Sequence, residues 1–326
     1  MLQSDGDALA ASRTTLELMA TLMESSFEAV GEGTILASMP AYMERFGRDN
    51  AQWMSQRFGT EPPRGAGSAL SAMNFISQVT DTPYDMVEAT RGHAIKRLKT
   101  CEFRDAFENR GDFPKTMMCL LHRAAYQGSV NGLVPAAEGF DVQIKSRILF
   151  GDDHCDFDVT ARGGMDVTKD EGKLPEEKPT QEEQAWLAYG FYTFLLTSFI
   201  DYLTHHLPSD QVEQMIRECG RKVGAKVQHL LDPLGVLPED DAGKARTVLE
   251  LGGRQFGDGL QVRACPQAAH IIATTAPDAP ELQQRVRENA CRLCKHFVAG
   301  ALGKDVERDG AIALGDAHCG FRLEAS

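Results

Sequence analysis

A seven-residue pattern occurs twice in this chain of 326 residues and constrains its fold more than any other feature. Residues 151–157 read GDDHCDF and residues 315–321 read GDAHCGF, so both follow the frame Gly-Asp-x-His-Cys-x-Phe at an offset of 164. The same offset places Cys101 on Cys265. Self-similarity at one fixed spacing indicates that a structural unit occurs twice in the chain.

The length of the chain also favours two domains, because a single hydrophobic core rarely serves a chain this long. Within each copy, the hydrophobic pattern predicts long helices followed by short strands. We therefore predict an α+β fold, a tandem repeat of a domain with several helices packed on a small antiparallel sheet, which forms a pseudo-dimer within one chain. The predicted parts are a flexible tail, a first repeat, an acidic linker and a second repeat, at residues 1–12, 13–161, 162–183 and 184–326.

Local patterns predict the elements of each copy. In the first copy they indicate helices at 14–30, 40–58, 83–94 and 114–133, and strands at 95–103, 140–150 and 155–159. In the second copy they indicate helices at 184–206, 210–231, 240–252 and 279–302, and strands at 260–265, 270–274, 310–314 and 319–323. Each Gly-Asp pair predicts a tight two-residue hairpin turn with a positive φ at the glycine.

The net charge and the distribution of apolar residues argue against several classes of partner. A formal net charge of -13 argues against nucleic acid and against anionic membranes. Residues 1–11 lack the basic start and apolar run of a signal peptide, and the most apolar stretch, 185–200, is too short and too polar to span a membrane. We predict a cytoplasmic protein without nucleic-acid or membrane partners, and homo-oligomer formation stays open.

Eight cysteines without a secretory signal are expected to be reduced thiols. Side chains alternate along a strand, so Cys155 and Phe157 are expected on one face and His154 on the other. Cys155 and His154 are therefore not expected to form one catalytic pair. A buried free cysteine is often a small core residue, whereas a nucleophile needs a thiol with a lowered pKa beside a base.

A zinc site is the other chemistry that the cysteines suggest. Cys291, Cys294 and His296 have ligand types and spacing that suit zinc, but Cys119 and His122 in the first copy give a different spacing pattern, CxxH. Cysteines one helical turn apart are also explained by packing. We predict no metal, and no cofactor either, since the sequence has no nucleotide-binding signature.

The Gly-Asp hairpin, preceded by a long helix and an upstream cysteine, resembles the L-2-amino-thiazoline-4-carboxylate hydrolase family and, more distantly, 4-vinyl-reductase-like small-molecule-binding domains. The resemblance covers Val87–Val159 and Val248–Leu323. It implies helices with an antiparallel sheet, and opening of a C–N bond in a small sulfur-containing ring. The zinc ligands of the vinyl-reductase-like domains are not matched, because Ile144 and Arg147 occupy two of their positions.

We therefore expect a hydrolase-like enzyme that acts on a small molecule with the assistance of cysteine. The resemblance implies catalytic residues in both copies, namely Cys119, Asp141, Cys155, Cys291, Asp305 and Cys319. Further residues are expected to contact the ligand, namely Cys101, His122, Phe157, Cys265 and Phe321. The alternative is a non-catalytic protein whose paired domains bind an aromatic or tetrapyrrole-like ligand, with the cysteines as core residues.

Overall fold

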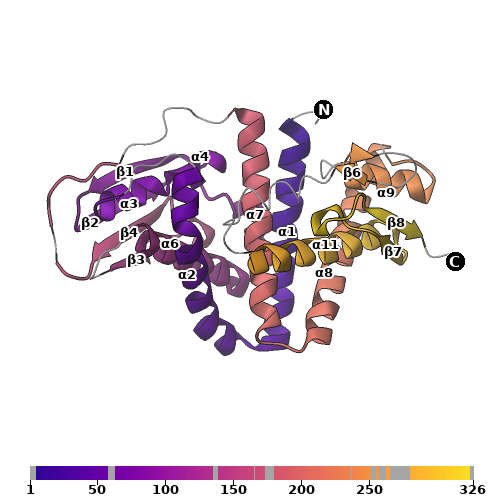
Figure 1. Cartoon of the computed structure of the whole chain (residues 1–326), viewed down its shortest axis with the longest axis horizontal. Helices are drawn as coiled ribbons and strands as arrows, with labels where there is room; N and C mark the ends of the chain where they lie inside the picture. The colour runs from indigo at the N-terminus through magenta and orange to yellow at the C-terminus, as the bar shows by residue number, and fades with distance from the viewer. Residues whose placement is uncertain are drawn as a thin grey trace. The chain divides into compact units, whose positions relative to one another are not determined.

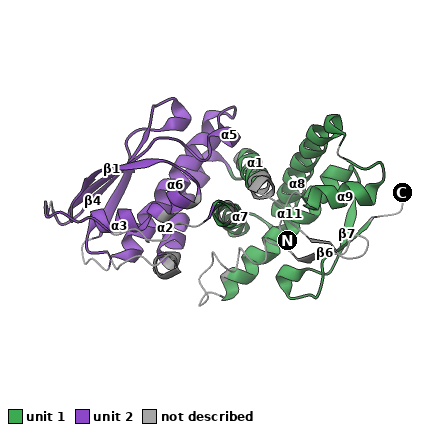
Figure 2. Cartoon of the chain, turned by 90° about the horizontal axis from the view of Figure 1, so that it is seen from above, with its two compact units in different colours: residues 1–30, 181–326 green, residues 31–180 purple. Residues whose placement is uncertain are grey.

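A computed structural model describes most of the chain, at residues 5–57, 63–134, 139–164, 166–172, 180–235, 237–250, 255–256, 262–264 and 280–323. The chain divides into two compact units (Figure 2). Unit 1 contains residues 1–30 and 181–326, and unit 2 contains residues 31–180. Unit 2 is therefore an insertion between the first helix and the rest of unit 1. Both units combine helices with small antiparallel sheets, which confirms the predicted α+β class.

Unit 2 contains a four-stranded antiparallel sheet with the order β1-β2-β4-β3 (Figure 1). Its strands are β1 (Tyr84–Ala89), β2 (His93–Leu98), β3 (Phe140–Ile144) and β4 (Cys155–Ala161). Its helices are α2 (Glu32–Arg57), α3 (Ala66–Ala72), α4 (Asn74–Val79), α5 (Arg104–Phe107) and α6 (Asp112–Leu133), with a 3-10 turn η1 (Ile148–Phe150).

One face of this sheet forms part of the core of unit 2. Ala94, Lys96 and Leu98 of β2 are buried and alternate with partly exposed residues, as the two-residue period of a strand requires. In the antiparallel register, Lys96 pairs with Phe157 of β4. Helix α3 packs against β1, β2 and β4, and α6 packs against β3. A lysine thus lies on the sheet face that packs against the helices.

The described part of unit 1 contains the helices α1 (Asp5–Val30), α7 (Gln181–Thr204), α8 (Ser209–Leu231), α9 (Asp241–Glu250) and α11 (Pro280–Leu302). Its short strands and 3-10 turns are β5 (Gln255–Phe256), β6 (Val262–Ala264), β7 (Val306–Asp309), β8 (Gly320–Leu323), η2 (Asp232–Leu234) and η3 (Ile312–Leu314). Strand β5 pairs with β6, and β7 pairs with β8, both in the antiparallel sense.

Helix α1 belongs with the C-terminal part of the chain. It packs against α7 and α8, where the thiol of Cys219 donates to the carbonyl oxygen of Leu18 at 3.2 Å and Lys226 pairs with Glu17 at 2.8 Å. The sequence-based division placed residues 14–30 in the first repeat instead. The helix also begins at Asp5, inside the segment predicted as a flexible tail.

The same helix crossing occurs in both units and depends on glycine. A Cβ on Gly128 of α6 would overlap the carbonyl oxygen of Glu44 in α2, and a Cβ on Gly300 of α11 would overlap that of Arg221 in α8. The absence of a side chain therefore lets the two backbones approach closely in each pair. By this match, Gly128 corresponds to Gly300. These two glycines are 172 residues apart, eight more than the offset of 164 between the two hairpin motifs.

The two loops that carry the repeated motif have the same local geometry. Gly151 and Gly315 have φ values of 99° and 102°, the left-handed region that favours glycine. The aspartate after each glycine accepts a hydrogen bond of 2.6 Å from the backbone N–H five residues before it. Cys155 and Cys319 each accept a hydrogen bond from the backbone N–H of an isoleucine seven residues earlier, at 3.1 Å and 2.9 Å.

Several predicted elements are wrong in kind or in length. Each Gly-Asp pair follows a 3-10 turn inside a longer loop, so the predicted two-residue hairpin is wrong although the positive φ is confirmed. The predicted helix at 83–94 is β1 and the start of β2, because pairing between these strands overrides the helix-favouring residues in this segment. The predicted strand at 310–314 contains η3, and β7 precedes it. The predicted strand at 270–274 lies outside the described residues.

Part of the segment predicted as a linker is bound to unit 2. The buried carboxylate of Asp170 accepts hydrogen bonds from the backbone N–H and the hydroxyl of Ser68, at 3.0 Å and 2.8 Å. Lys169 forms a β-bridge with Thr90. Within the described ranges, none of the helices, including the apolar α7, is long and apolar enough to cross a membrane.

Candidate functional site

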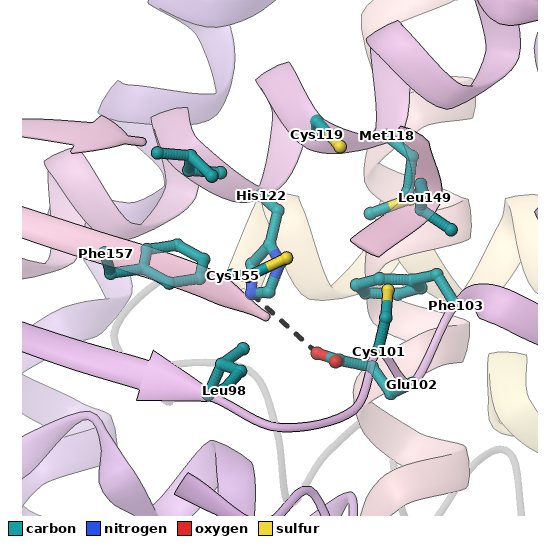
Figure 3. Close-up of a pocket in the computed structure, with 11 residues that line it drawn as sticks. Leu98, Cys101, Glu102, Phe103, Met118, Cys119, His122, Leu149, Cys155 and Phe157 are labelled. Atoms are coloured by element: carbon teal, nitrogen blue, oxygen red, sulfur yellow. Dashed lines mark ion pairs between the residues drawn. The ribbon is translucent and has the colours of Figure 1, made fainter. Parts of the chain in front are cut away.

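A small cavity in unit 2 lies between the end of β2, helix α6, the start of β4 and the loop that contains η1 (Figure 3). Its volume of about 20 Å³ gives room for one or two water molecules. The residues that line it are Leu98, Cys101, Glu102, Phe103, Met118, Cys119, His122, Ile144, Leu149, Cys155 and Phe157. We call it the thiol cavity.

Three cysteines from different elements meet at the thiol cavity. Cys101 follows β2, Cys119 lies in α6, and Cys155 is the first residue of β4. All three are partly buried and none is in a disulfide. The antiparallel register sets Cys155 opposite Leu98, near the end of β2 from which Cys101 continues. Strand pairing therefore brings together residues that are distant in the sequence.

Five of the predicted site residues of the first copy line this one cavity, namely Cys101, Cys119, His122, Cys155 and Phe157. The sixth, Asp141, does not. It lies on the exposed side of β3, where its carboxylate accepts hydrogen bonds from the guanidinium of Arg162 at 2.7 Å and 2.9 Å. The alternation of β3 explains this placement, because the neighbours Phe140 and Val142 are buried.

The thiol cavity also contains an acid and an imidazole close together. The side chain of Glu102 is only 3% exposed, and its Oε1 lies 3.8 Å from Nε2 of His122 (Figure 3). Neither Oε2 of Glu102 nor Nε2 of His122 has a hydrogen-bond partner in the described part of the chain. Buried polar atoms are usually satisfied, so two unsatisfied ones at a cavity indicate a place for a water or a ligand.

The ring of His122 is held by aromatic neighbours. Its centroid lies 5.3 Å from that of Phe103, 5.0 Å from that of Tyr126 and 5.0 Å from that of Phe157, all in edge-type contacts. These contacts fix the plane of the imidazole.

Burial shifts the acid and the imidazole in a way that suits proton transfer. Removal from water raises the pKa of Glu102 to about 7, although its own backbone N–H and the charge of Lys96 act in the opposite direction. Burial, with a smaller contribution from Lys96, lowers the pKa of His122 to about 3. At neutral pH the imidazole is therefore uncharged, while the carboxyl group of Glu102 can gain or lose a proton.

The same burial keeps the three thiols protonated. It raises the pKa of Cys119 to about 12 and that of Cys155 to about 11, and it raises the pKa of Cys101 as well. The backbone N–H of Ile148, which donates to Cys155, acts in the opposite direction but does not reverse the shift. None of these thiols is therefore set up as a thiolate at neutral pH.

In the second copy the corresponding residues belong to a hydrophobic core. Cys291, Cys319 and Phe321 are buried in one cluster with aliphatic residues of α9 and α11. Asp305 is exposed and forms an ion pair with Arg221. Cys265 lies outside the described residues.

The acid–imidazole pair is not repeated in the sequence of the second copy. The offset of 164 places Pro266 at the position of Glu102. The spacing of 172 that relates the glycines of the two helix crossings places Cys294 at the position of His122. The two copies therefore differ at the residues that could transfer a proton.

Sequence reasoning missed Glu102. A glutamate directly after a strand cysteine gives no pattern of its own, and only the fold shows that its side chain is buried. In the described part of the chain, no group of three or more His, Cys, Asp or Glu residues could hold a metal ion. Comparison with protein-family models, with curated proteins and with solved structures finds no match for this chain.

Proposed function

We propose that unit 2 is a hydrolase that opens a C–N bond of a small molecule bound at the mouth of the thiol cavity, whose space of about 20 Å³ holds the attacking water. One observation carries the proposal. A buried carboxylate, that of Glu102, has an oxygen without a hydrogen-bond partner in the described residues and borders a space large enough for water. A carboxyl group with a pKa of about 7 is well matched to general acid–base catalysis at neutral pH. The resemblance to the thiazoline-carboxylate hydrolases supports the same reaction class.

The proposed reaction needs only a water and the residues of the cavity. The carboxylate of Glu102 takes a proton from the water, and the water oxygen bonds to the amidine-like carbon of the substrate. The protonated Glu102 gives its proton to the ring nitrogen. It then takes the proton of the newly bound hydroxyl group and passes it to the same nitrogen, as the C–N bond breaks and a C=O bond forms. Neutral His122 hydrogen-bonds to the water or the substrate through Nε2.

The cysteines have a different role in this proposal from that of a free thiolate nucleophile. Cys101, Cys119 and Cys155 contact the substrate as polarizable, protonated thiols, which suit a sulfur-containing or apolar ring. Glu102 is the proton acceptor in this proposal, because Asp141, the carboxylate among the predicted catalytic residues of the first copy, faces solvent beside Arg162.

We further propose that the chain is a tandem repeat in which only the first copy is active. The matched helix crossings and motif loops support two copies of one unit. Pro266 and Cys294 at the positions of Glu102 and His122 support the loss of proton transfer in the second copy. The second copy then has a structural role, with its repeated cysteines in the core.

The substitution Glu102→Gln tests the proposed hydrolysis. It keeps the shape of the side chain but cannot accept the proton, so turnover of L-2-amino-thiazoline-4-carboxylate should fall roughly 10²–10⁴-fold. Glu108→Gln is the matched control, because Glu108 is exposed and pairs with Arg104 on the surface. Equal turnover in the wild type and Glu102→Gln would show that Glu102 is not the base.

A non-catalytic ligand-binding protein is the second candidate. The observation that favours it is the raised pKa of all three cavity thiols, which makes them unreactive core-like groups at neutral pH. Calorimetry with the same thiazoline compound, followed by analysis of the recovered ligand, separates the two. Binding that depends on Glu102 and returns intact ligand supports the binding protein, and a ring-opened product supports the hydrolase.

A further inference from the structure

Lys96 is a buried cation next to the thiol cavity that the proposed reaction does not use. Its side chain is 0% exposed and projects from β2 on the core face of the sheet. Its Nζ donates a hydrogen bond of 3.2 Å to the hydroxyl of Tyr126, and it lies 4.9 Å from the ring centroid of Tyr84 and 5.5 Å from that of Tyr126. Aromatic rings attract a cation, but they do not neutralise its charge.

Two tyrosines contact the ammonium group of Lys96, namely Tyr84 of β1 and Tyr126 of α6. The ring of Tyr126 packs against His122, whose Nε2 lies 3.8 Å from Oε1 of Glu102, and Phe157 lies opposite Lys96 in β4. Of these, Glu102 is the one that becomes a carboxylate. A buried charge is costly unless an opposite charge compensates it, so Lys96 and Glu102 depend on each other.

We propose that Lys96 is a positioning residue of the thiol cavity, whose buried ammonium group stabilises the carboxylate form of Glu102 that accepts a proton. The inference rests on the proposed function of Glu102. It adds that the proton-accepting state of the cavity is set by a residue that does not line it. Tyr126 connects Lys96 to the cavity, because its hydroxyl accepts a hydrogen bond from Lys96 and its ring packs against His122.

Lys96 and Glu102 each affect the pKa of the other, as this arrangement requires. Burial lowers the pKa of Lys96 to about 7, and the charge of Glu102 opposes that shift. The charge of Lys96 in turn lowers the pKa of Glu102 and that of His122. Each of the two charges therefore favours the ionised form of the other group.

The substitution Lys96→Met tests the inference without any ligand. It removes the charge and keeps a long unbranched side chain, so Glu102 should ionise at a pH higher by about one unit or more. Carbon-13 NMR of the Glu102 carboxyl group, assigned by its loss in Glu102→Gln, measures the midpoint in the full-length protein. Lys99→Met is the matched control, since Lys99 is exposed and pairs with Asp85 on the surface. An unchanged midpoint in Lys96→Met would overturn the inference.

A reciprocal measurement covers the case in which Lys96→Met does not fold. In Glu102→Gln, the Lys96 amine should lose its proton at a lower pH than in the wild type, as followed by nitrogen-15 NMR of labelled lysine. An equal midpoint would refute the coupling. Both titrations are independent of turnover. A shifted midpoint without hydrolysis would therefore refute the proposed function alone, and hydrolysis with an unshifted midpoint would refute only the role of Lys96.

Discussion

Burial has opposite effects on the acid and the imidazole that meet in the thiol cavity. It favours the protonated form of Glu102 and the deprotonated form of His122, so both groups tend to be uncharged. Two neutral groups with unsatisfied polar atoms can face a small cavity without a strong electrostatic penalty. The protonation states of these two side chains therefore follow mainly from their removal from water. For Glu102, the charge of Lys96 acts in the opposite direction.

The depressed pKa of His122 predicts a pH dependence of stability. Its folded-state pKa of about 3 is below the unfolded value of about 6.5. The contribution of the neutral, buried imidazole to the free energy of unfolding is therefore fully present above pH 6.5 and is lost as the pH falls towards 3. His122→Phe keeps the aromatic contacts and removes the titration. Urea unfolding from pH 7 to pH 3 should therefore show a smaller loss of stability in the variant than in the wild type.

A control for this measurement is His229→Phe. His229 is an exposed residue of α8, so its replacement should leave the pH dependence of the wild type intact. The interpretation fails if the free energy of unfolding of His122→Phe decreases with acidification as steeply as that of the wild type.

The sequence predicted five of the eleven residues that line the thiol cavity, but not the acid. Cys101, Cys119 and Cys155 repeat in the chain or match a motif, so they stand out before the fold is known. Asp141 also matched, but the alternation of β3 turns its side chain to solvent. Glu102 has no motif, and burial is a tertiary property that a single sequence does not reveal.

At the scale of elements, the crossing of α2 and α6 holds the cavity wall in place. Helix α6 contributes Cys119 and His122 to the thiol cavity, and its close approach to α2 depends on Gly128. The corresponding crossing of α8 and α11 depends on Gly300. Glycine is unfavourable inside a helix, so its presence at both crossings indicates a packing requirement.

Gly128→Ala should destabilise unit 2. The added methyl group would overlap the carbonyl oxygen of Glu44, and overpacking of this kind costs roughly 1–3 kcal/mol. Chemical denaturation compares this variant with Gly111→Ala, where an added Cβ meets nothing within 4 Å. Equal stabilities of the two variants would show that the helices separate at no cost.

Long helices were predicted better than strands. Helices α6, α8 and α11 lie within a few residues of their predicted bounds, since apolar periodicity accumulates over many turns. Strand β1 was predicted as helix, because Met86, Glu88 and Ala89 favour helices and only pairing with β2 makes them extended. The motif loop was predicted as a tight turn, because sequence does not show that η1 precedes Gly151.

At the scale of the whole molecule, the two loops that carry the repeated motif have the same local structure but different surroundings. Cys155 lines the thiol cavity and Cys319 lies in a hydrophobic cluster, although each accepts the same type of backbone hydrogen bond. The motif therefore specifies the conformation of a loop. The residues packed around the loop determine whether its cysteine lines a cavity or lies in a hydrophobic cluster.

A matched pair of substitutions tests this difference. Under the proposed function, in which the Cys155 thiol contacts the substrate, Cys155→Ala should lower kcat/KM for the thiazoline probe roughly tenfold or more. Cys319→Ala should leave kcat/KM unchanged and destabilise the protein by about 1 kcal/mol. Steady-state kinetics and chemical denaturation of both variants give the comparison. A similar loss of kcat/KM in Cys319→Ala would place a site in the second copy as well.

The insertion of unit 2 into unit 1 has a consequence for the order in which the chain is made. Helix α1 is synthesised before unit 2, whereas α7 and α8, against which α1 packs, follow unit 2 in the chain. The 150 residues of unit 2 and then both of these helices must be added before α1 has its partners. At about 5–20 residues per second, the apolar face of α1 waits roughly ten seconds or more for its partners. Unit 2 can finish folding in that interval, so the nascent chain completes the inserted unit before the unit that surrounds it in the sequence.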